Sequence, residues 1–215
     1  MIYWLRADAR HIEEEGVHDA TLIEFDGFED VDFSNPDIDF QKERGAPEVI
    51  EFVGNLENAA WLDFIFTSPI GMLLISKRMV RVLESVKPFR YKLIPTVIYS
   101  EKVKHLVCKR GTKGRTWYQV HDPALRNDDF VILQLQEQFD CLDKERTKIG
   151  GVPFHQYDEE YLGPEDTDPL VLREPEGGFP PVFAVPELVF YCFTEEARQA
   201  CDKACLKGLL WHPVK

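Results

Sequence analysis

The sequence GMLLISKRMVRVLESVKPFRYKLIP, at residues 71–95, has a counterpart at residues 189–213, VFYCFTEEARQACDKACLKGLLWHP. When Ser76 is aligned with Thr194, both stretches show an apolar run, a hydroxyl residue, a helix-like segment, and a short apolar run that leads to a proline. Serine and threonine are favoured helix N-caps, because their side-chain oxygen accepts a hydrogen bond from the first turn. Each stretch therefore predicts a strand, a capped helix and a second strand.

Each predicted helix carries an apolar stripe at helical spacing, which predicts that one face packs on a core. The stripes are Met79, Val82, Leu83 and Val86 in the first helix and Ala197, Ala200, Cys201 and Ala204 in the second. Pro88 is expected to stop the first helix, and Gly208 is expected to stop the second.

A strand–helix–strand crossover places its two strands in one sheet and its helix on a face of that sheet. Two copies predict an α+β fold, a mixed and largely antiparallel sheet with two covering helices from the repeated unit. We expect residues 1–215 to form a single domain, with residues 1–66 as its acidic N-terminal part.

The remaining strands are predicted from apolar and alternating segments. They are residues 2–6, 21–25, 47–53, 61–68 and 131–139, with a hairpin of 103–108 and 115–121 around a basic tip. The 131–139 segment alternates apolar residues with glutamines, which predicts a strand with one buried and one solvated face. Residues 150–181 contain six prolines and five glycines and are expected to form a long loop.

Composition favours a globular protein of the cytoplasm. Of the 215 residues 44% are hydrophobic, and no apolar run is long enough to cross a membrane as a helix. The N-terminal residues turn acidic where a signal peptide would be apolar. The five cysteines have no paired spacing, so a disulfide framework is not expected. Cys201, Cys205 and His212 could suggest a metal site, but small core residues explain the cysteines better.

Charge is distributed unevenly along the chain, which has a formal net charge of −13. Residues 1–66 carry −13, residues 67–126 carry +10 and residues 127–215 carry −10. Such a field bears on the choice of partner. Phosphate repels a net acidic protein, so a basic protein is the expected partner and nucleic acid is not.

Carboxylates cluster at two places in the sequence where a metal site or a catalytic site has to be considered. Residues 26–39 lack the ligand spacing and the closing glutamate of an EF-hand, so calcium is not expected. Asp140, Asp143 and Glu145, with His121 or His155, could serve a metal-dependent hydrolase. Basic residues interleave these carboxylates, and ordinary pairing and capping explain them equally well. The sequence contains no Walker loop, Gly-x-Ser-x-Gly, His-Glu-x-x-His or dinucleotide fingerprint.

The stretches LLISKRMVRVLESV, LQLQEQFDCLDKERTKI and VFAVPELVFYCFTEEARQACDKACLKGLLWHPV resemble a family of bacterial immunity proteins encoded beside polymorphic toxins, the one numbered eleven in the immunity-protein series. The resemblance covers roughly residues 60–148 and 179–214. Thr194 stands where the family pattern has serine. The positions that carry the resemblance are structural ones, namely Ser76, Leu142, Asp143, Glu145, Thr194, Gly208 and Pro213.

The resemblance implies a protein that binds and neutralises a toxin, acts without a cofactor or metal and is not an enzyme. The acidic N-terminal third could block the basic substrate cleft of a nuclease toxin. The residues expected to bind it are Glu29, Asp30, Asp32, Asp37 and Asp39, with Phe28 and Phe33 as aromatic anchors. Three alternatives stay open: a scaffold for another basic protein, the hydrolase, and nucleic-acid binding through residues 77–115.

Overall fold

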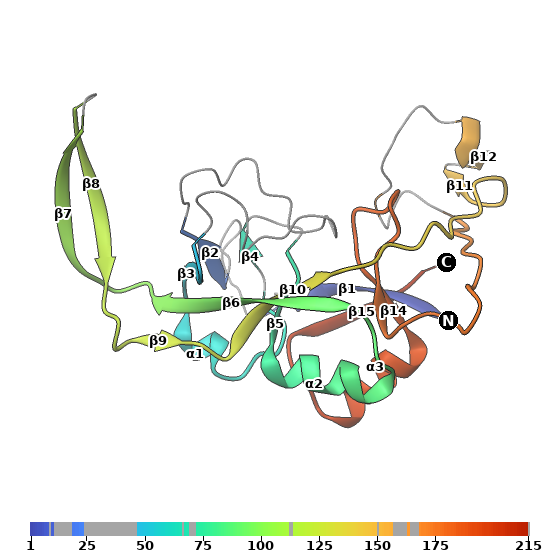
Figure 1. Cartoon of the computed structure of the whole chain (residues 1–215), viewed down its shortest axis with the longest axis horizontal. Coiled ribbons are helices and arrows are strands. Elements are labelled where there is room, and N and C mark those ends of the chain that lie inside the picture. Colours follow the sequence, from blue (N-terminus) through green and yellow to red (C-terminus); the bar gives the residue numbers. More distant parts are fainter. Residues whose placement is uncertain are drawn as a thin grey trace.

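A computed structural model gives the fold of the chain (Figure 1). It describes residues 1–8, 10, 19–23, 47–65, 67–68, 72–111, 114–149, 151–156, 163 and 168–214. The fold is α+β with mostly antiparallel strands, as the sequence predicts. No helix in these ranges is both long and apolar enough to cross a membrane.

The strands and helices follow in chain order. The N-terminal half contains β1 (Ile2–Ala7), β2 (Ala20–Leu22), β3 (Ile50–Gly54), α1 (Leu56–Ala59), β4 (Thr67–Ser68), β5 (Leu74–Ser76), α2 (Lys77–Val86) and β6 (Tyr91–Ser100). The middle of the chain contains β7 (Val103–Gly111), β8 (Gly114–His121), β9 (Arg126–Asn127), β10 (Phe130–Leu135), β11 (Lys148–Ile149), β12 (Val152–Pro153) and the 3-10 helix Phe154–Gln156. The C-terminal part contains β13 (Val182–Phe183), β14 (Cys192–Thr194), α3 (Glu195–Lys203) and β15 (Leu209–Pro213).

Two larger sheets organise the described strands. A four-stranded sheet has the order β13-β14-β1-β15, and a seven-stranded sheet has the order β4-β2-β3-β6-β10-β5 with β9 paired to β6. Within the seven-stranded sheet the pairs β2–β4 and β3–β6 are parallel. Strands β7 and β8 pair only with each other among the described strands, and so do β11 and β12.

The predicted unit exists twice, and each copy encloses an antiparallel strand. Strand β10 lies between β5 and β6, and strand β1 lies between β14 and β15. Val131 of β10 pairs with Ile75 and Pro95, while Tyr3 of β1 pairs with Phe193 and Pro213. The flanking strands of both copies therefore have the same register around their central strand. The central strand follows its unit in the first copy and precedes it in the second.

Backbone hydrogen bonds extend the equivalence beyond the predicted unit. The amide of Lys77 donates to Asp129 at 2.8 Å, and the equivalent amide of Glu195 donates to Met1 at 3.1 Å. The amide of Ser76 donates to Asp63 at 2.8 Å, and that of Thr194 donates to Pro181 at 3.1 Å. The equivalence therefore extends to Asp63 and Pro181 with the same offset of 118 positions.

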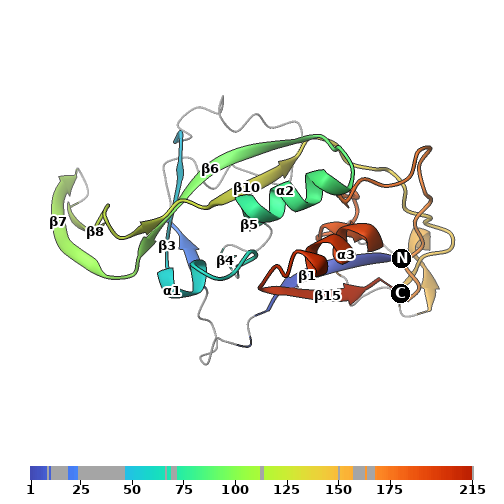
Figure 2. The same cartoon turned by 90° about the horizontal axis from the view of Figure 1, so that it is seen from below.

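A shared core joins the two copies, although they belong to different sheets and not to one continuous sheet. Helices α2 and α3 contact each other, and both views show them on the same side of the strands (Figures 1 and 2). Met79 and Leu83 of α2 and the equivalent Ala197 and Cys201 of α3 are fully buried in one cluster. Large side chains on one helix and small ones on the other let the helices pack closely.

Four local expectations need correction. Of the strand expected at residues 61–68, only β4 is a strand, and the described residues 61–65 form no more than an isolated β-bridge. Strand β10 is buried on both faces, and Gln134, expected in solvent, is 1% exposed. Helix α3 ends at Lys203. Just after this end, Cys205 adopts a positive φ of 54° and the Leu206 amide donates to the Cys201 carbonyl. Gly208 therefore does not stop the helix. The described part of residues 150–181 is not an open loop, because Phe154 and Leu170 are buried in a core cluster.

Candidate functional site

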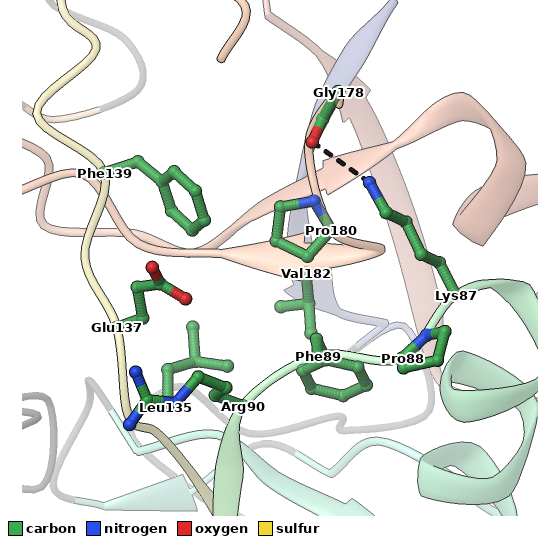
Figure 3. Close-up of a pocket in the computed structure, with 10 residues that line it drawn as sticks. All are labelled: Lys87, Pro88, Phe89, Arg90, Leu135, Glu137, Phe139, Gly178, Pro180 and Val182. Carbon is green, nitrogen blue, oxygen red and sulfur yellow. Dashed lines mark hydrogen bonds between the residues drawn. The ribbon is translucent and has the colours of Figure 1, made fainter. Parts of the chain in front are cut away.

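A cleft of about 240 Å³ lies where the first unit meets the second (Figure 3). The turn from α2 to β6 forms one wall, the residues from β10 onward form another, and the segment that leads into β13 forms the third. Its lining residues are Lys87, Pro88, Phe89, Arg90, Leu135, Glu137, Phe139, Gly178, Pro180 and Val182.

The Lys87 ammonium holds one wall of this cleft in place. Its Nζ donates to the carbonyls of Gly177 at 2.7 Å, Gly178 at 3.1 Å and Phe179 at 3.4 Å. Gly177 and Gly178 have φ values of 87° and 75°, a conformation that favours glycine. Lys87 is therefore engaged in fixing this turn, and its charge is already met by three carbonyl dipoles.

The rest of the cleft is apolar with a charged rim. Leu135 and Val182 are buried, and Phe139 packs at 6.0 Å, edge to face, against Phe183. Arg90 and Glu137 are exposed. The apolar lining makes the cleft suited to take an apolar or aromatic side chain.

The carboxylates considered for hydrolysis have structural roles or lie in solvent. The Asp143 carboxylate accepts from the Arg146 amide at 3.1 Å and pairs with the Arg173 guanidinium at 3.5 Å. Asp140 and Glu145 are exposed. Asp143 thus caps the turn and pairs with Arg173, which are the structural roles that the sequence analysis gave as the alternative to catalysis.

The two histidines named with these carboxylates lie apart. Nδ1 of His155 is 3.4 Å from the Lys144 carbonyl, beside the carboxylate turn. Nδ1 of His121 is 2.9 Å from the Ser100 carbonyl, at the end of β8 on the opposite side of the molecule from β11 (Figure 1). The described ranges contain no group of three or more His, Cys, Asp or Glu side chains placed to hold a metal ion.

The positions that carry the family resemblance form the framework. Ser76 and Thr194 are the N-caps of α2 and α3, accepting from Met79 and Ala197 at 3.0 and 3.3 Å. Leu142 is buried and forms an isolated antiparallel β-bridge with Leu172. Pro213 ends β15. Gly208 has a φ of 82°, and a Cβ there would lie 2.2 Å from the Phe64 carbonyl oxygen.

Asp63 is a framework residue that the sequence analysis did not single out. Its side chain is almost fully buried, accepts from Ser76 Oγ at 2.6 Å and from the Lys207 amide at 2.9 Å, and lies 3.6 Å from the Arg78 guanidinium. It therefore ties the cap of α2 to the turn before β15. The equivalent residue in the second copy is Pro181. Because the two copies differ at this position, comparison of their sequences does not reveal the role of Asp63.

The second candidate surface is the ribbon of β7 and β8, which projects away from both sheets (Figure 1). Val103 and Leu106 are 40% and 57% exposed on it. The residues predicted to bind a toxin, Phe28, Glu29, Asp30, Asp32, Phe33, Asp37 and Asp39, lie outside the described part of the chain.

The chain matches no protein-family model, and a search of curated proteins finds no significantly similar sequence.

Proposed function

We propose that this protein binds a toxin protein in the cytoplasm and neutralises it by direct contact. The observation that carries the proposal is the resemblance of residues 60–148 and 179–214 to immunity proteins, in which the shared positions are framework positions. Ser76, Thr194, Leu142 and Asp143 all hold the fold together in the structure. A family that keeps its framework can vary the surfaces that select the toxin.

Charge supports a protein partner. The chain carries −13 overall, and residues 1–66 alone carry −13. Such a charge attracts a basic protein and accelerates its association. A toxin that acts on nucleic acid has a basic cleft, which an acidic inhibitor is suited to cover.

The role of Asp143 supports binding over hydrolysis. Its carboxylate is occupied by a backbone amide and a guanidinium, and the cleft of Figure 3 holds no nucleophile with a base. This arrangement favours recognition of a partner as the role of these surfaces.

The test is affinity capture from a lysate of the source organism at low and at high salt, with bound proteins identified by mass. We expect one small basic protein that kills cells when expressed alone and spares them when this chain is co-expressed. If no protein retained at low salt is toxic, or if co-expression does not restore growth, the proposal is wrong.

A further inference from the structure

The ribbon of β7 and β8 has the geometry of a docking arm. Its strands pair from Val103 with His121 out to Gly111 with Gly114, and no other described strand pairs with either of them. Figure 1 shows the ribbon standing off the body. A nine-residue strand reaches about 30 Å. Two unpaired strand edges invite a further strand from a partner.

The arm is also strongly cationic. Residues 102–121 contain six lysines and arginines and no acidic residue, so the other 195 residues carry −19. Lys104 pairs with Asp122 at 3.3 Å at the base of the arm. The charge of the arm comes from the sequence, and a segment with this positive charge attracts an anionic partner.

Apolar exposure accompanies this charge. Leu106 and Val103 are exposed large apolar residues, and Cys108 is exposed as well. Apolar side chains beside free strand edges suit contact with a polypeptide, and they add nothing to the binding of phosphate.

We propose that the β7–β8 ribbon is the arm through which the protein grips an acidic patch on its protein partner, adding to an extended segment of that partner. This inference rests on the proposed function, namely that the partner is a protein. A nucleic-acid duplex carries a charge about every 1.7 Å, and the −19 of the remaining residues repels it. A short acidic segment of a protein carries far fewer charges and is repelled less.

Two exposed cysteines allow a direct test on the full chain. Cys108 lies on the arm and Cys205 follows α3, whereas the other three cysteines are buried. The alkylation rate of each exposed thiol is measured alone and with three probes: a peptide of about twelve residues alternating Glu and Val, the same peptide with Lys for Glu, and a short DNA duplex. We expect the acidic peptide to slow alkylation of Cys108 about tenfold and to leave Cys205 unchanged.

A variant with neutral arm residues, Lys109→Gln, Arg110→Gln, Lys113→Gln and Arg115→Gln, should lose that protection. The matched control removes four exposed charges elsewhere, with Arg81→Gln, Arg146→Gln, Lys203→Gln and Lys207→Gln, and should keep it. Circular dichroism checks that both variants fold. Equal protection by the basic peptide, stronger protection by DNA, or no protection by the acidic peptide would overturn the inference.

Growth rescue separates this inference from the proposed function. If the wild type and the charge-matched control rescue cells from the captured toxin and the arm variant does not, the arm makes the contact. If all three rescue, the arm inference fails and the proposed function stands. If the wild type does not rescue, the proposed function itself fails, and the peptide experiment decides separately whether the arm binds acidic segments.

Discussion

Ser76 and Thr194 are equivalent N-caps in two copies of one structural unit, 118 positions apart, but only the first copy has a carboxylate for its cap to reach. Ser76 Oγ accepts from the Met79 amide and donates to the buried Asp63. In the second copy the residue equivalent to Asp63 is Pro181, which has no side-chain acceptor. The two caps therefore contribute differently to stability.

Alanine at the two caps should separate these contributions. Loss of a cap costs about 1 kcal/mol, which is the expected effect of Thr194→Ala. Ser76→Ala should cost about 2–4 kcal/mol, because a buried carboxylate also loses a donor. Urea unfolding measures both, with Ser85→Ala on the exposed face of α2 as the control. Equal losses at Ser76 and Thr194 would show that the bond to Asp63 contributes nothing.

Gly208 should tolerate no side chain. Alanine there would adopt a φ of 82° and place its Cβ 2.2 Å from a backbone oxygen. Alanine at Gly151 isolates the effect of the positive φ, since the φ there is 88° and no atom lies within 4 Å of the Cβ position. Gly151→Ala should cost about 1 kcal/mol, and Gly208→Ala several times more. Similar unfolding midpoints for the two variants would contradict the steric argument.

The caps show why much of the framework was predictable and why the second sheet was not. Hydroxyl residues before helical stripes have local signals, so Ser76 and Thr194 could be placed from sequence. The central strand β1 precedes its unit in the chain, whereas β10 follows its unit. Because of this different order, the sequence does not show that the two strands are equivalent. Gln134 was misplaced because a glutamine in an alternating segment looks solvated, whereas strands on both sides bury β10.

The candidate site was less predictable than the framework. Asp63 acts through contacts with Ser76 and Lys207, and Lys207 is 144 positions away. No local sequence pattern therefore predicts the role of Asp63. The cleft at Lys87 likewise forms where distant segments meet. The hairpin of β7 and β8 was predicted, but its separation from both sheets depends on tertiary pairing.

Glu195 should make stability depend on pH in the acid range. Hydrogen bonds from Arg198, Tyr3 and Gln199 lower its pKa from 4.5 to about 2. Because the folded pKa lies below the unfolded one, this stabilisation is complete above pH 4.5 and is lost as the pH falls toward 2. Glu195→Gln should reduce the change in the free energy of unfolding between pH 4.5 and pH 2. Urea unfolding at several pH values measures this change. Glu196→Gln, in the same turn, is the control, and an equal effect there would contradict the assignment.

Asp143→Asn should affect the fold and not a reaction. The asparagine keeps a side-chain oxygen for the Arg146 amide and loses the ion pair with Arg173, so we expect a loss of about 0.5–1 kcal/mol. Titration calorimetry with Mg²⁺ and Mn²⁺ should give no heat of binding for the wild type or the variant. Metal binding that disappears in Asp143→Asn would favour the hydrolase instead.

Charge reversal in the acidic N-terminal segment tests whether it contacts the toxin. Changing Asp30, Asp32, Asp37 and Asp39 to lysine should weaken binding of the captured toxin and flatten the dependence of its dissociation constant on salt, because long-range attraction is the part that salt screens. Binding is measured by surface plasmon resonance at several ionic strengths. The matched control reverses four exposed acidic residues elsewhere, Glu57, Glu84, Asp128 and Asp202. If both variants lose affinity equally, net charge alone governs association, and the segment has no specific role.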